Sequence, residues 1–83
     1  MITQEEAKRI AESFLDEYVR PQIPFEVVIV ERAITEQNDH WVFPYNGRAY
    51  VESSDWNEAL AGNNPVYVNR LDYSVGFLRV NKP

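Results

Sequence analysis

The chain has 83 residues, no cysteine and a formal net charge of −5. A chain of this length supports one hydrophobic core, so we expect a single domain over residues 1–83. The lack of cysteine excludes disulfides, thiolate metal sites and a cysteine nucleophile, and it fits a reducing compartment, for which the cytoplasm is the expectation.

The negative charge is concentrated in the first half of the chain. Residues 1–40 contain nine Asp and Glu against four Lys and Arg, whereas residues 41–83 contain four of each. This distribution disfavours a nucleic-acid partner, which needs clustered Lys and Arg, and favours a protein partner with a basic surface. The first ten residues lack the apolar core of a signal peptide, and no apolar run approaches a membrane span, so we expect a soluble protein without a membrane partner.

The first predicted element is an amphipathic helix that begins after Thr3. Thr3 and Glu6 have the spacing of a capping box, in which hydroxyl and carboxylate satisfy amides of the first turn. Pro21 lacks an amide donor and disfavours helical geometry at Arg20, so the helix should end near Val19 or Arg20. The apolar stripe expected to face the core consists of Ala7, Ile10, Ala11, Phe14, Leu15 and Tyr18.

Residues 25–34 are rich in β-branched side chains and predict a strand with both faces largely covered. The next signal is the segment "WVFPYNGRAYVE", in which Asn46-Gly47 is typical of a type I′ turn between two strands. Such a hairpin would place Phe43 opposite Tyr50. It would also place Trp41 opposite Glu52. The missing amide of Pro44 predicts an unpaired edge or a bulge at that position.

Residues 54–62 predict a short helical turn, capped by Ser54 or Asp55 and stopped by Gly62 in a left-handed conformation. Two further strands are predicted over residues 65–69 and 74–80, and Gly76 within the second indicates a bulge or a close backbone approach. The whole pattern predicts an α+β fold. Its N-terminal amphipathic helix would pack on an antiparallel sheet of about five strands, with the short helical turn between the third and fourth strands.

No constellation of residues in the sequence predicts catalysis. His40 is the single histidine, and no second histidine or Glu-x-x-His pattern completes a metal-ligand set around it. Ser53 and Ser54 lack a Gly-x-Ser-x-Gly context and are better interpreted as turn and cap residues. We therefore expect a protein without enzymatic activity, cofactor or metal. A small enzyme that uses His40 with Asp39 is a weaker hypothesis than the two binding functions given below.

The sequence contains more large aromatic side chains than one small helix-on-sheet core needs, and Trp, Tyr and Arg are enriched at interface hot spots. Acidic residues of the N-terminal helix add a charged face on which a basic partner could dock. Most aromatics should still fill the core, and the acids can serve solubility alone. The residues predicted to contact a partner are Glu5, Glu12, Asp16, Glu17, Trp41, Tyr45 and Arg48.

The hairpin-like segment and the later stretch "LAGNNPVYVNR" resemble the bacterial immunity protein 35 family over nearly the whole chain. The family pattern continues after the fourth strand with an acidic residue and a Thr-Gly turn. At that place this chain has Asn69 and "RLDYSVG" instead. The motif residues, for which we expect a structural role, are Trp41, Phe43, Tyr45, Leu60, Gly62, Asn63, Pro65 and Val68.

The resemblance implies a non-enzymatic protein that neutralises a cognate toxin of a polymorphic, secreted or contact-dependent system by occluding its active or target-binding site. The alternative is an interaction module that self-associates or binds a peptide through an exposed sheet edge, near Pro44 or Gly76.

Overall fold

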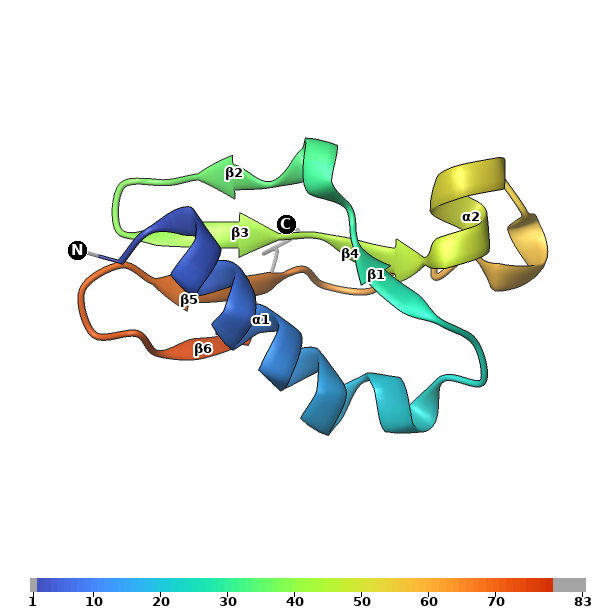
Figure 1. The fold of residues 1–83 in the computed structure, drawn as a ribbon, viewed down its shortest axis with the longest axis horizontal. Helices are drawn as coiled ribbons and strands as arrows, with labels where there is room; N and C mark the ends of the chain where they lie inside the picture. The colour runs from blue at the N-terminus through green and yellow to red at the C-terminus, as the bar shows by residue number, and fades with distance from the viewer. Residues whose placement is uncertain (1, 79–83) are drawn as a thin grey trace, which may run out of the picture.

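The computed structural model describes residues 2–78, which form helices and antiparallel strands (Figure 1). In chain order the helices and strands are α1 (Gln4–Tyr18), β1 (Val27–Ile29), β2 (Thr35–Glu36), β3 (His40–Phe43), β4 (Tyr45–Gly47), α2 (Arg48–Ser53), β5 (Val66–Asn69) and β6 (Val75–Phe77). Short 3-10 helices cover Arg20–Gln22, Glu31–Ala33 and Trp56–Glu58. The predicted α+β class is confirmed.

Helix α1 begins and ends where the sequence predicts. The Thr3 hydroxyl accepts a hydrogen bond from the Glu6 amide at 3.2 Å and donates one to the Glu6 carboxylate, also at 3.2 Å. Ala7, Ala11 and Leu15 on its inner face are fully buried. After Tyr18 the chain tightens into a 3-10 turn because Pro21 cannot continue the α-helical hydrogen bonds.

The strands described here divide between two antiparallel sheets, whereas the sequence predicted one sheet of about five strands. One sheet has four strands in the order β2-β3-β5-β6, and the other consists of β1 and β4. Pro44 stands between β3 and β4, at the point where the chain passes from the first sheet to the second. Its carbonyl accepts a hydrogen bond from the Val30 amide at 2.8 Å, while its missing amide interrupts the ladder.

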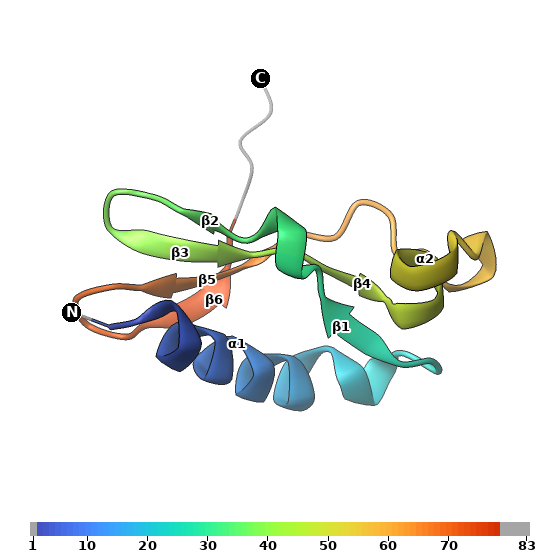
Figure 2. The same cartoon turned by 45° about the horizontal axis from the view of Figure 1, so that its top comes forward.

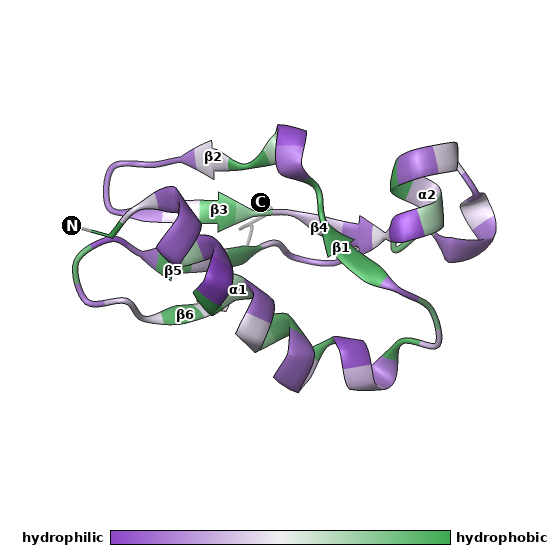
Figure 3. Ribbon diagram, viewed as in Figure 1, coloured by the Kyte–Doolittle hydropathy of each residue, from purple (hydrophilic) through white to green (hydrophobic). Residues whose placement is uncertain are grey.

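A hydrophobic cluster joins α1 to both sheets. Phe43, Val66 and Val68 from the four-stranded sheet are fully buried, and Val27 contributes from β1. Figure 2 shows α1 lying against one face of the four-stranded sheet, with β1 beside it. In Figure 3, β1 is hydrophobic over most of its length, while α1 alternates between hydrophilic and hydrophobic segments as an amphipathic helix does.

The predicted hairpin at Asn46-Gly47 is wrong. Both residues belong to β4, where Val27 pairs with Gly47 and Val28 with Asn46, and Gly47 has a φ of −63° instead of the positive value of a type I′ turn. The predicted strand over residues 48–52 is helix α2.

The cross-strand pairs that followed from that hairpin are therefore also wrong. Phe43 pairs with Val66 and Trp41 with Val68, not with Tyr50 and Glu52. Strand β3 instead folds back on β2 through the polar residues 37–39, with Glu36 paired to Trp41.

Other sequence predictions hold in part. The strand expected over residues 25–34 is confirmed only at Val27–Ile29, since Glu31–Ala33 forms a 3-10 helix. The helical turn after Asp55 is confirmed, with the Asp55 side chain accepting from the Asn57 amide, and Gly62 has a left-handed φ of 74°. The two last strands are confirmed as β5 and β6, although residues 79–80 of the predicted range lie outside the described residues.

Candidate functional site

A groove with charged walls lies between α1, β1 and α2. Its lining residues are Glu12, Glu26, Val28, Ile29, Glu31, Arg32, Arg48, Val51 and Glu52. Four of these nine side chains are carboxylates and two are guanidinium groups, so the lining carries a net negative charge. Val28 and Ile29 from β1 and Val51 from α2 add apolar side chains to the lining.

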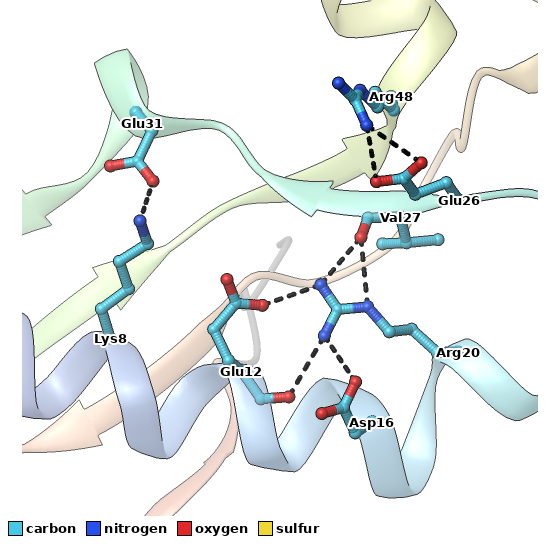
Figure 4. Close-up of polar contacts among 8 residues, drawn as sticks. All are labelled: Lys8, Glu12, Asp16, Arg20, Glu26, Val27, Glu31 and Arg48. Atoms are coloured by element: carbon cyan, nitrogen blue, oxygen red, sulfur yellow. Dashed lines mark hydrogen bonds and ion pairs between the residues drawn. The ribbon is translucent and has the colours of Figure 1, made fainter.

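Arg20 holds the α1 side of this region in place. Its Nη2 donates to Glu12 Oε1 at 2.7 Å and its Nη1 to Asp16 Oδ1 at 2.8 Å, while Nε and Nη2 reach the carbonyl of Val27 at 3.1 and 2.8 Å (Figure 4). Although desolvation lowers it, the pKa of Arg20 is raised overall by its hydrogen bonds to Glu12 and Asp16. The guanidinium thus ties helix α1 to strand β1 and fixes two carboxylates.

Arg48 fulfils the same role on the α2 side. Its Nη1 lies 3.2 and 3.1 Å from the two carboxylate oxygens of Glu26, and its Nε donates to Glu52 Oε2 at 2.9 Å. Hydrogen bonds to Glu52 and then to Glu26 raise the pKa of Arg48. Lys8 of α1 forms an ion pair with the groove residue Glu31 (Figure 4). The groove carboxylates are therefore held in defined positions by cations of the same chain.

The structure brings three of the predicted partner-contacting residues to this region. Glu12 and Arg48 line the groove, and Asp16 shares Arg20 with Glu12. Glu5 and Glu17 are exposed elsewhere on α1, without an ion pair among the described residues.

The two predicted aromatic contacts do not line the groove, although Tyr45 on β4 pairs with the groove residue Ile29. Trp41 is half-buried on β3, with the Arg70 guanidinium 5.9 Å from its ring centre. Tyr45 is only 7% exposed, so its ring offers little surface to a partner. Burial raises the pKa of Tyr45, against an opposing hydrogen bond with Asn63.

Sequence reasoning missed Glu26, Glu31 and Glu52 as groove residues. Glu26 and Glu31 flank a short strand and carry no local signal. Glu52 follows Arg48 by four residues, which is the spacing of a helical ion pair. That signal becomes readable only once residues 48–53 are known to be a helix.

Several motif residues make contacts within the scaffold. The Asn63 side chain donates to the Tyr45 carbonyl at 3.1 Å, and Pro65 accepts from the Leu78 amide at 2.7 Å. The Asn46 side chain both accepts from the Leu60 amide at 2.7 Å and donates to its carbonyl at 3.2 Å. The structural role of the motif residues stays a prediction, and these are the contacts through which they would exert it.

The His40 and Asp39 side chains approach each other at 2.5 Å in the turn before β3. Within residues 2–78, no group of three or more His, Cys, Asp or Glu is placed to hold a metal ion. Nor does any helix in that range have the length and apolar character needed to cross a membrane.

The geometry is that of a small α+β protein whose most organised polar surface is a network of paired charges. Residues 5–82 match the family model for immunity protein 35, and this match covers nearly the whole chain. The chain therefore belongs to the immunity protein 35 family. No curated protein and no solved structure matches it.

Proposed function

We propose that this protein is a non-enzymatic inhibitor that binds a cognate polymorphic toxin in the cytoplasm and occludes its active or target-binding site. The observation that carries this proposal is the family match over residues 5–82. An immunity protein acts on a partner protein, so its function resides in a surface rather than in a catalytic centre. The groove between α1, β1 and α2 is the surface that we propose for toxin binding.

The arrangement of the groove supports a basic partner. Glu26 and Glu52 are both held by Arg48, and Glu31 is held by Lys8, so their positions are set before a partner arrives. Preorganised groups lose less side-chain entropy on binding than mobile ones do. Lys or Arg side chains of a toxin would meet the carboxylates of the groove beside the apolar side chains of Val28 and Val51.

The excess of acid should act mainly on the association rate. A chain with a net charge of −5 steers a basic partner toward it, and salt screens this attraction over a distance of about 10 Å at 0.1 M. We therefore expect added salt to slow association with the toxin more than it speeds dissociation.

Co-expression with the toxin gene next to this one tests the proposal. The protein should rescue cells from that toxin, and a double variant Glu31→Gln and Glu52→Gln should bind the purified toxin more weakly in calorimetry. The matched control is Glu5→Gln with Glu17→Gln, which removes the same charge from α1 outside the groove. Failure of the unaltered protein to rescue cells would refute the proposed function.

The double variants also locate the binding surface. If the control pair weakens binding and the groove pair does not, the toxin binds the outer face of α1 and not the groove. These measurements would decide whether Glu5 and Glu17 are toxin contacts. Trp41 and Tyr45 remain predicted contacts.

A further inference from the structure

A second groove lies on the opposite flank of α1, beside strand β6. It is lined by Arg9, Ile10, Ser13, Phe14, Glu17, Tyr18 and Val75. Figures 1 and 2 show α1 and β6 next to each other at one edge of the four-stranded sheet. Unlike the first groove, this one contains one acid and one base, so it carries no net charge.

Aromatic side chains form the apolar part of this face. The Phe14 ring lies 4.8 Å from Tyr18 and 5.0 Å from Phe77, measured between centroids. Tyr18 and Phe77 nevertheless remain 51% and 40% exposed. Large aromatics left in water beside a groove mark a surface where burial of apolar area would stabilise a complex.

Among the described residues, strand β6 is the outer strand of its sheet and its outer edge pairs with no other strand, while its residue Val75 lines the groove. The Ser74 carbonyl and the Leu78 amide point toward β5, where they bond Asn69 and Pro65. Because these groups alternate along a strand, the amides and carbonyls of Val75 and Phe77 point outward. The edge thus offers four backbone groups to an added strand.

One row of α1 side chains gives the groove a symmetric pattern. Arg9, Ser13 and Glu17 follow one another at four-residue spacing, and the small Ser13 lies midway between the two charges. Neither Arg9 nor Glu17 has an ion pair among the described residues. If a second copy of α1 is laid antiparallel across Ser13, Arg9 of each copy meets Glu17 of the other.

We infer that this face binds a second copy of the chain, giving a twofold homodimer in which β6 pairs with β6 and α1 packs against α1. A twofold interface is formed by one patch that complements itself. The edge of β6 and the row of Arg9, Ser13 and Glu17 both meet that condition. Antiparallel pairing about Gly76 would join Val75 of each copy to Phe77 of the other through the free backbone groups. The exposed rings of Tyr18 and Phe77 would be covered at the same time.

The neutrality of the patch favours a second copy over a basic toxin. A basic partner would be drawn to the acidic groove on the other flank, whereas this groove has one charge of each sign. A standard interface covers about 800 Å² on each partner, which is about one seventh of the 5650 Å² surface of this chain. To reach that area, the dimer would bury both the groove and the edge of β6. The inference is independent of the proposed toxin binding.

Charge reversal in the full chain tests the inference. Sedimentation equilibrium of the unaltered protein should show a monomer–dimer equilibrium. Arg9→Glu and Glu17→Arg should each weaken the dimer about tenfold, or ~1.4 kcal/mol, because two attractive contacts become repulsive. The double variant should restore dimerisation, since the exchanged charges attract again.

Matched controls separate this effect from net charge and folding. Arg32→Glu and Glu5→Arg alter the charge equally at exposed positions outside this groove and should leave dimerisation unchanged. Far-UV circular dichroism should show the same helix content in every variant. A monomer at all concentrations, or a double variant that fails to restore pairing, would overturn the inference. So would a monomer in which both single variants lose toxin binding, because the groove would then be a toxin site.

Discussion

Two regions of this molecule are held together in different ways. Helix α1 and the four-stranded sheet share fully buried side chains such as Leu15, Phe43 and Val68. Residues 48–65, which we term the lobe, extend from β4 at one end of the molecule (Figure 1), and none of their side chains is buried. The lobe is attached by polar contacts and by partial packing of Leu60 against the hydrophobic cluster.

The contacts of the lobe are few and specific. Asn46 bonds both backbone groups of Leu60, the Asn63 side chain bonds the Tyr45 carbonyl, and the Arg48 amide bonds the Glu26 carbonyl at 2.8 Å. Apolar burial is spread over many atoms, whereas each hydrogen bond depends on one geometry. The difference implies that the sheet region governs global stability and that single polar groups govern the position of the lobe.

The largest expected effect comes from the sheet region. Phe43→Ala should lower the free energy of unfolding by about 3–5 kcal/mol, because it removes a fully buried ring and leaves a cavity. Urea unfolding followed by circular dichroism measures this loss. Tyr50→Ala in the lobe is the control and should cost less, because Tyr50 is only half-buried. Equal losses would show that the lobe is as strongly packed as the sheet region.

Gly47→Ala should have the next largest effect, at the junction of the two regions. A β-carbon there would collide with the Glu58 carbonyl and come within 2.8 Å of the Phe25 ring, so the lobe must shift. We expect a cost of about 2–3 kcal/mol in thermal or urea unfolding. Gly62→Ala meets no atom within 4 Å and should cost only about 1 kcal/mol, for its positive φ. A tolerated Gly47→Ala would contradict the close packing described here.

Asn46→Ala should act on the lobe more than on the sheet region. It leaves the Leu60 amide without its side-chain acceptor, at a cost of about 1–2 kcal/mol. Hydrogen exchange should accelerate in residues 56–62 while the amides of α1 keep their protection. Asn64→Ala removes an exposed amide of the lobe and provides the comparison. Equal acceleration throughout the chain would mean that the two regions unfold together.

The smallest expected effect is a difference in stability between Tyr45→Phe and the unaltered protein at alkaline pH. Burial raises the pKa of Tyr45, so the folded state favours the neutral phenol. The stability from this shift is fully present below the unfolded pKa of about 10 and is lost as pH rises through the folded pKa. When the pH is raised from neutral to above that value, the free energy of unfolding measured with urea should therefore fall less for Tyr45→Phe than for the unaltered protein. Tyr73→Phe, at an exposed position, should follow the unaltered protein.

The sheet region is also the part that the sequence predicted best. The apolar stripe from Ala7 to Tyr18, the cap at Thr3 and the stop at Pro21 are local signals, and all correspond to the observed α1. Strands β5 and β6 likewise lie within the two predicted ranges, residues 65–69 and 74–80. Where a local pattern and tertiary packing agree, sequence reasoning is sufficient.

The start of the lobe was mispredicted because nonlocal contacts outweigh a strong turn signal. Asn46 is used for bonds to Leu60, fourteen residues later, and Gly47 for the approach of the Glu58 carbonyl. Neither requirement is visible in the dipeptide Asn-Gly itself. The error carried over to the candidate site, since Arg48 was expected on a hairpin beside Trp41 and Tyr45 but lies on α2 facing Glu26.

The exposed indole of Trp56 makes the lobe observable by itself. Trp56 is 76% exposed, and its ring centre lies 5.0 Å from that of Tyr50 in a tilted arrangement, whereas Trp41 is half-buried in the sheet region. The chain has only these two tryptophans. Each region thus carries its own intrinsic fluorophore. Replacing either indole by phenylalanine would leave tryptophan emission from the other alone, so detachment of the lobe and unfolding of the sheet could be followed as separate optical signals in the two variants.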